Sequence, residues 1–239
     1  MSEALFRILV QSHVFDLMII FLAFFALYHI LKYRPIKTVN LILGFYCVFC
    51  ILFFVLSNTQ VLYRFFEPKS KSVRIAFETL NSAFCVAELI VFSSFFFLLL
   101  KNKLLRKAIV FMSLLNSITI LNFLLTIFNH SSRKADIFEA SITLDIGVLI
   151  TLFIFCILFY YSTMQNICSI FPKNKGVLWI VNSLFFYIIL TLPFFFLHEE
   201  TKRIDRLVFN TMYSLHYFCI ANLLVSIGLA FKTTKTLTE

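Results

Sequence analysis

The sequence predicts an all-α, polytopic integral membrane protein that folds as one bundle of seven transmembrane helices. Seven long apolar stretches, separated by short charged segments, fill most of the 239-residue chain. Hydrophobic residues make up 61% of the chain, charged residues only 14%, and the mean hydropathy is +0.93. Soluble domains are about half apolar and about a quarter charged. The segments between the stretches are too short for a second domain, so residues 1–239 are predicted to form a single transmembrane domain.

Each stretch supplies the ~20 predominantly apolar residues that a helix needs to cross the hydrocarbon layer. The runs are continuous and do not alternate between polar and apolar residues, as the strands of a membrane barrel would. The predicted helices cover residues 13–31, 39–56, 77–100, 104–128, 138–161, 176–197 and 207–231.

Charged residues separate these spans in order along the chain. The first span is followed by Lys32, the third by Lys101, the fifth by Lys173 and the seventh by Lys232. The second, fourth and sixth are followed by segments that mix acidic and basic residues. The first run has spanning length but no basic segment before it and no clear cleavage site, so it is expected to remain as an anchor and not to act as a cleaved signal peptide.

Basic residues are distributed unevenly between the two sides of the predicted bundle. One side holds eleven of them, opposed only by the terminal Glu239, whereas the other side holds ten basic and eight acidic residues that nearly cancel. The eleven are Lys32, Arg34, Lys37, Lys101, Lys103, Arg106, Lys107, Lys173, Lys175, Lys232 and Lys235. Because cytoplasmic segments carry the excess of Lys and Arg, this side is predicted to be cytoplasmic, with the N-terminus outside and the C-terminus inside. We therefore expect a multi-pass protein of the cell membrane.

The net charge of +9 indicates attraction to the anionic head groups of a lipid bilayer. No basic run is interleaved with aromatic residues in a way that suggests nucleic-acid binding, and no nucleic-acid partner is expected. The sequence does not specify an oligomeric state.

Cysteine and histidine spacings do not indicate a metal or cofactor site. Cys47 and Cys50 form a C-x-x-C, but on a spanning helix that spacing favours packing over redox or metal chemistry, because no second Cys or His pair matches it. The predicted outer segments hold no cysteine, so no extracellular disulfide is expected. Phosphate-binding and dinucleotide-binding glycine motifs are absent from the sequence. We expect no cofactor, no metal and no catalytic residues.

Ionisable residues inside a spanning helix are costly, so Asp16, Glu88 and Asp145 are candidates for a functional site. Asp16 lies so close to the interface that its side chain is expected to reach toward water. Glu88 shares one helical face with Asn81 and Cys85, and that face is expected to look into the bundle. With no intramembrane Lys or Arg to pair with it, Glu88 is expected to be neutral at rest and to titrate. Two interpretations remain open: interhelical hydrogen bonding and a proton- or ligand-binding role.

A second group of polar residues is predicted at the depth of the outer half of the bundle. Asp145 on the fifth span, Asn122 on the fourth, and Tyr213 and His216 on the seventh lie at this level by the ~1.5 Å rise per residue. Their convergence would form a polar cavity open to the outside, where ligands often bind in helix bundles. This cavity is a hypothesis, because residues at one level need not face each other.

The third and seventh spans share a residue pattern that suggests an internal repeat. The third reads F-E-T-L-N-S and then A-E-L-I-V-F-S; the seventh reads F-N-T-M-Y-S and then A-N-L-L-V-S. The pattern suggests a three-plus-one-plus-three plan in which spans one to three and five to seven are parallel repeats about the fourth. Asn222 is then the counterpart of Glu88, and the pair would lie near a pseudo-symmetric centre.

Three functional classes compete. A receptor or sensor needs a stiff bundle, an outer pocket and a basic cytoplasmic face, and this chain has residues for all three. A small-solute or proton-coupled transporter usually has helices broken by Gly or Pro near the membrane midplane, whereas Pro193 is the only proline well inside a span here. A lipid-modifying enzyme would need a nucleophile, a metal cluster or an acid–base pair, and only separated carboxylates are visible. A receptor or sensor is therefore the preferred interpretation.

The seven-span plan is shared with retinal proteins and G-protein-coupled receptors, but residues that those proteins need are missing. No lysine lies in the middle of the seventh span to carry retinal, Trp179 is the only tryptophan, and there are no cysteines for an outer-loop disulfide. A sensor without an appended signalling domain would act through a separate cytoplasmic protein. We expect that protein to dock on Lys101, Lys103, Arg106 and Lys107, together with the tail 232–239.

Overall fold

The computed structural model describes residues 14–32, 38–66, 71–129, 134–165, 175–204 and 206–233, and these residues form seven α-helices. They are α2 (Val14–Lys32), α3 (Thr38–Phe66), α4 (Lys71–Leu99), α5 (Lys103–Phe128), α6 (Lys134–Gln165), α8 (Lys175–Ile204) and α9 (Arg206–Thr233). All seven contain a segment long and apolar enough to cross a membrane. The predicted all-helical class and seven spans are confirmed, and the chain is a multi-pass membrane protein.

Several helices continue beyond the ends that hydropathy predicted. The second predicted span ends at residue 56, whereas α3 continues to Phe66; the sixth ends at residue 197, whereas α8 continues to Ile204. The 29 residues of α3 rise about 43 Å, more than the ~30 Å of hydrocarbon. Apolar runs mark only the part of a helix that lies in lipid. The extension of α8 is rich in Glu, Lys and Arg, which are good helix formers, whereas the extension of α3 over 57–66 holds only one charged residue, Arg64.

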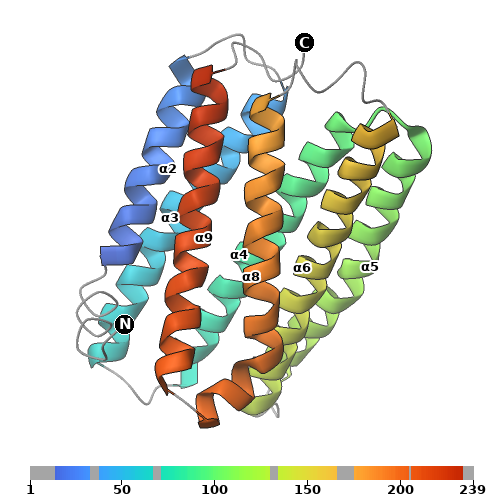
Figure 1. Ribbon diagram of the computed structural model, residues 1–239. Helices are drawn as coiled ribbons and strands as arrows, with labels where there is room; N and C mark the ends of the chain where they lie inside the picture. Colours follow the sequence, from blue (N-terminus) through green and yellow to red (C-terminus); the bar gives the residue numbers. More distant parts are fainter. Residues whose placement is uncertain are drawn as a thin grey trace.

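Six of the seven helices form a closed ring, and α5 lies outside it (Figure 1). The order around the ring is α2, α3, α4, α6, α8 and α9, and α9 packs against α2 to close it. The remaining helix, α5, packs against α4 and α6 at the edge of the bundle.

The helices alternate in direction, so basic side chains gather at one end of the bundle. The ends of α2, α4, α6 and α9 and the beginnings of α3, α5 and α8 lie together at this end (Figure 1). We call it the basic end, after Lys32, Lys103, Lys175 and Lys232.

Close packing between the first and last helices depends on small residues. Ala23 and Ala26 of α2 are fully buried, and a methyl group added at Gly228 of α9 would lie 2.6 Å from Phe25 Cε1 and 3.3 Å from Ala26 Cα. In lipid, helix association depends on such close packing, because the acyl chains are as apolar as leucine. The ring is therefore closed by a contact at which a residue larger than Gly228 would have to displace the Phe25 ring.

Phenylalanines fill the ring interior and also face outward. Within the run from 95 to 97, Phe95 and Phe96 are fully buried, whereas Phe97 is 37% exposed. Phe92 is also buried, and its ring meets that of Tyr46 edge-on, with centroids 5.1 Å apart. The aromatic residues thus build the packed interior in which the candidate site lies.

Candidate functional site

Glu88 of α4 is buried inside the ring, and both of its oxygens accept hydrogen bonds from tyrosines on other helices. Only 1% of the residue is exposed. The Tyr46 hydroxyl of α3 donates to Oε1 over 3.0 Å, and the Tyr187 hydroxyl of α8 donates to Oε2 over 3.3 Å. The ring places α6 between α4 and α8, so the bond from Tyr187 crosses the interior. One carboxyl group therefore links three helices.

Asp145 of α6 is a second buried carboxyl group beside this arrangement. It is 6% exposed, it hydrogen-bonds with the Cys85 thiol one turn before Glu88, and it lies close enough to Glu88 for the two carboxyl groups to interact electrostatically. One turn before Asp145, the Ser141 hydroxyl meets that of Ser82 on α4 over 3.1 Å. The contact between α4 and α6 is thus lined with polar groups. Two neighbouring carboxyl groups in a medium of low dielectric constant disfavour being ionised together.

His216 connects the last helix to the same group of side chains. Its Nδ1 lies 3.3 Å from the Thr191 hydroxyl of α8, and its ring centroid lies 5.6 Å from that of Tyr187. The polar interior of the ring therefore involves α3, α4, α6, α8 and α9. We call Tyr46, Cys85, Glu88, Asp145 and Tyr187 the central cluster, with His216 at its edge.

The other predicted site residues lie in different environments. Asn81 is half-buried on α4, two turns before Glu88. Asn222 of α9 donates to the Ser183 hydroxyl of α8 over 3.4 Å, which gives it a role in the packing of those two helices. The structure describes the helical backbone at Tyr213, but the side chain of that residue lies outside the described part.

Asn122 is exposed on α5 and does not join the cluster. Its predicted depth is compatible with the outer half of the bundle, but α5 stands outside the ring and turns this residue away from the interior. The predicted convergence therefore fails at Asn122, because depth along a helix does not determine the direction in which a residue faces.

Asp16 also differs from its prediction. It was expected to reach toward water near the interface, but it is only 7% exposed, on the face of α2 that is buried against the bundle. Its position on that face is set by the same periodicity that buries Ile19, Ala23 and Ala26.

Tyr46 and Tyr187 were missed by the sequence reasoning. Each follows a phenylalanine near the middle of a span, so its ring is indistinguishable in hydropathy from the neighbouring aromatic residues. A signal was nevertheless present: a buried tyrosine hydroxyl usually finds a hydrogen-bond partner, so a tyrosine deep in a span indicates a polar group on another helix.

The remaining predictions concern the cysteines and the basic residues proposed for docking. Cys47, Cys50, Cys85, Cys156 and Cys219 carry free thiols, and within the described ranges no group of three His, Cys, Asp or Glu side chains is arranged to hold a metal ion. At the basic end, Lys101, Lys103 and Lys107 are exposed and Arg106 is half-buried. The tail after residue 233 lies outside the described residues.

No protein-family model matches the chain, and neither the curated proteins nor the solved structures contain a match to it.

Proposed function

We propose that this chain is a receptor or sensor of the cell membrane in which the central cluster binds a proton or the cationic group of a ligand. The observation that carries the proposal is the position of Glu88, whose two oxygens are hydrogen-bonded to Tyr46 and Tyr187 on two other helices of the ring. A buried group that is shared between helices connects its protonation state to their relative positions.

The chemistry of the carboxyl group explains how binding would change the bundle. An ionised Glu88 accepts a charge-assisted hydrogen bond from each tyrosine, and such bonds are roughly twice as strong as neutral ones. A protonated Glu88 accepts from one tyrosine through its carbonyl oxygen and can donate its hydroxyl to the other, which then becomes the acceptor, so one bond reverses direction and both become neutral and weaker. Protonation, or replacement of the proton by a cationic ligand group, therefore alters the link from α4 to α3 or to α8.

Asp145 and His216 connect the protonation of Glu88 to two further helices, α6 and α9. Asp145 interacts electrostatically with Glu88 from α6, and His216 lies beside Tyr187 from α9. In the proposed orientation, with the N-terminus outside, His216 and Asp145 lie on the outer side of Glu88 along the chain of polar groups. A proton or ligand from outside would reach Glu88 through them.

The proposed receptor would pass its signal to a partner protein at the basic end. We propose that this end is cytoplasmic and that a separate protein docks on Lys101, Lys103, Arg106 and Lys107, since the excess of basic residues lies there. Three of these four side chains are exposed, as a docking surface requires.

Transport of a small solute is the second candidate, and the ring order favours it over an enzyme. If α2, α3 and α4 form one repeat and α6, α8 and α9 the other, the order around the ring is the same in both halves, and α5 joins them from outside. The central cluster then lies between two similar halves, where the substrate sites of repeat-built transporters lie. Uptake of labelled solutes by proteoliposomes distinguishes the two candidates, because a receptor produces no flux.

Replacing Glu88 by glutamine tests the proposed proton site. Glu88→Gln keeps the shape of the side chain but removes the titrating group, so we expect a folded protein that has lost one protonation event. Infrared difference spectra between neutral and alkaline pH should show the loss of the carbonyl band of a buried protonated carboxyl group in the wild type, and the variant should lack this difference.

The matched control is Glu139→Gln, since Glu139 is an exposed carboxyl group on α6. It should leave the buried-carboxyl band unchanged. Identical spectra for the wild type and Glu88→Gln would reduce Glu88 to a hydrogen-bonding group that holds the helices together and would refute the proposed proton site.

A further inference from the structure

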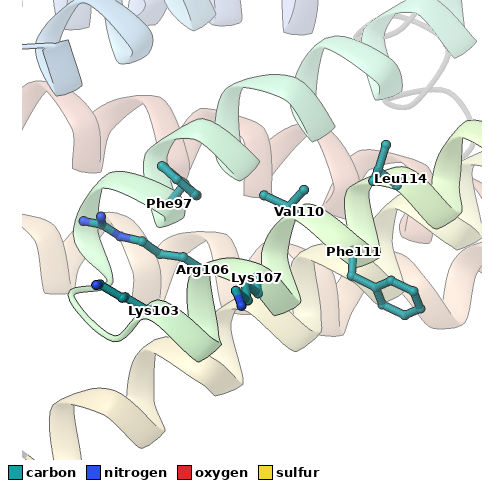
Figure 2. Close-up of a pocket in the computed structure, with 7 residues that line it drawn as sticks. All are labelled: Phe97, Lys103, Arg106, Lys107, Val110, Phe111 and Leu114. Atoms are coloured by element: carbon teal, nitrogen blue, oxygen red, sulfur yellow. The ribbon is translucent and has the colours of Figure 1, made fainter.

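A crevice between α4 and α5 opens on the outer surface of the bundle at the basic end, and its lining combines cations with apolar side chains. It has a volume of about 430 Å³ (Figure 2). Lys103, Arg106 and Lys107 supply the charge, and Phe97, Val110 and Leu114 supply apolar walls. Figure 2 shows Arg106 and Lys103 at one end of the crevice and Phe111 and Leu114 at the other. The wall of the crevice is therefore almost wholly apolar, and the charged groups lie at its edge, with Phe97 beside Arg106 and Lys107 between the two ends (Figure 2).

A second cavity continues the crevice along the surface of α4. Its volume is about 670 Å³, it shares Phe97, Val110 and Leu114 with the first, and it extends to Ile42 of α3. Together the two cavities form a groove that runs from the basic end along α4, between α3 and α5.

Serines widen this groove without making it polar. The Ser93 and Ser113 hydroxyls bond to each other over 2.8 Å across the α4–α5 contact, and the Ser94 hydroxyl donates to the Ile90 carbonyl of its own helix over 2.8 Å. These small side chains leave the space, and the hydroxyl groups of Ser93, Ser94 and Ser113 are hydrogen-bonded within the protein. Such a groove suits a hydrocarbon chain.

Arg106 is held in place at the charged end. Its Nε donates to the Leu100 carbonyl over 2.5 Å, and its guanidinium carbon lies 5.1 Å from the centre of the Phe97 ring. This geometry fixes the guanidinium plane while its terminal nitrogens extend toward the end of the crevice where Lys103 lies (Figure 2). The sequence of α5 contains no acidic residue, so the three cations have no counter-charge on their own helix.

We propose that this groove binds one anionic glycerophospholipid of the leaflet at the basic end. Its phosphate lies against Lys103, Arg106 and Lys107, and one acyl chain runs along Phe97, Val110 and Leu114. Charge complementarity supports a phosphate, because a fixed guanidinium and two lysines match its oxygens. Basic pockets between transmembrane helices recognise anionic lipid head groups in this way. The lipid uses cations that we also propose for protein docking, so the two ligands compete, but the lipid site does not depend on the role of the central cluster.

A tryptophan introduced in the crevice tests the proposal. The reporter is Phe111→Trp with the only native tryptophan removed by Trp179→Phe, reconstituted with phosphatidylglycerol or phosphatidylcholine that carries brominated acyl chains. Bromine quenches tryptophan only at short range. We expect the anionic lipid to reach half-maximal quenching at a several-fold lower mole fraction than the zwitterionic lipid. The control reporter, Leu121→Trp, is exposed on α5 but outside the groove, so it should be quenched equally by both lipids.

Charge variants then test the head-group contacts. Lys103→Gln and Lys107→Gln alter exposed side chains, so folding should persist; each should reduce the preference for the anionic lipid, and the double variant should show little preference. Lys175→Gln together with Lys232→Gln removes two cations at the same end but outside the crevice and should preserve the preference. Equal quenching of the Phe111→Trp reporter by both lipids, as expected if the cations serve only a soluble acidic protein, would overturn the proposal. So would a preference that survives the Lys103 and Lys107 changes.

Discussion

A carboxyl group in the interior of a helix bundle needs a partner for each of its oxygens, and Glu88 takes them from two tyrosines. The phenol rings of Tyr46 and Tyr187 pack like the phenylalanines around them, and only their hydroxyl groups distinguish them from an apolar core. In a medium of low dielectric constant each such hydrogen bond is stronger than in water, and a missing one is correspondingly costly. The position of Glu88 is therefore specified by two atoms, one on each tyrosine.

Removing those hydroxyls should reveal energetic coupling to Glu88. Tyr46→Phe and Tyr187→Phe should each reduce the free energy of unfolding by about 1 kcal/mol, the usual net value of one hydrogen bond. Combined with Glu88→Gln, the effects should be non-additive, with a coupling of about 0.6 kcal/mol, the average between transmembrane helices, and at most about 1.7 kcal/mol. Unfolding in a series of detergent mixtures provides the measurement.

The control for this cycle is Tyr160→Phe, because Tyr160 donates to Asn182 over 2.7 Å at an exposed position away from Glu88. Its effect should add to that of Glu88→Gln. Additive behaviour for Tyr46 and Tyr187 as well would show that the two hydrogen bonds do not link these residues in the folded protein.

The sequence was sufficient to single out Glu88 but not its partners. The cost of a carboxyl group in lipid makes it conspicuous in any apolar span, whereas a tyrosine among phenylalanines is not. Asn122 shows the opposite error: it has the right depth and the right chemistry, yet it faces away from the ring. Which side of a helix is buried depends on its neighbours, and a single apolar span has little amphipathic pattern from which to read that side.

At the scale of the element, α5 illustrates how narrow the contact of a transmembrane helix can be. Its buried residues are Ile109, Asn116 and Phe123, each seven positions from the next, so a single seam faces α4 and α6. Asn116 fixes that seam by donating to the Thr151 hydroxyl of α6 over 2.6 Å and to the Met112 carbonyl of its own helix over 3.1 Å. An amide deep in a span is expected to serve helix packing, and the structure places Asn116 in that role.

Two glycines in the ring should respond differently to alanine. A methyl group at Gly228 meets Phe25 and Ala26 too closely, so Gly228→Ala should push α9 from α2 and lower the melting temperature. At Gly44 the nearest atoms lie 3.8 Å away, on Ile30 and Leu27, which is ordinary packing distance. Gly44→Ala should therefore preserve or raise stability, by up to ~1 kcal/mol from helix propensity.

Thermal unfolding of the purified protein in mild detergent compares the two glycine variants directly. Equal melting temperatures for Gly228→Ala and Gly44→Ala would show that α2 and α9 are not packed as closely as the structure indicates.

At the scale of the whole molecule, the number and approximate position of the helices could be predicted from hydropathy, but the ring could not. Counting spans needs only the cost of exposing a polar backbone to lipid. The order of the helices around the ring depends on specific pairs, such as Gly228 against Ala26 and Ser82 against Ser141, that lie far apart along the chain. The lengths were underestimated for a related reason, since the ends of α3 and α8 leave the apolar layer and remain helical.

The proposed orientation can be measured with single cysteines at the two ends of the bundle. Lys101→Cys lies at the basic end, and Glu139→Cys lies near the opposite end of α6; both positions are exposed. With the N-terminus outside, a membrane-impermeant maleimide should label Glu139→Cys in intact cells and Lys101→Cys only after permeabilisation. Both variants are made in, and compared with, a Cys168→Ser chain, because Cys168 lies outside the described residues; Cys47, Cys50, Cys156 and Cys219 are buried and Cys85 is half-buried. The reverse pattern would invert the proposed topology and move the lipid site to the outer leaflet.

The position of α5 outside the ring has a consequence for how the chain is threaded through the membrane. Three helices cross the bilayer an odd number of times, so a three-helix unit ends on the face opposite to the one on which it began. A second unit that followed directly would therefore be inserted in the opposite orientation. A single extra crossing restores the starting face, and α6, α8 and α9 can then run in the same directions as α2, α3 and α4. This helix contributes little to the interior, but its presence makes the number of crossings odd, and deleting it would leave the second half of the ring facing the wrong side.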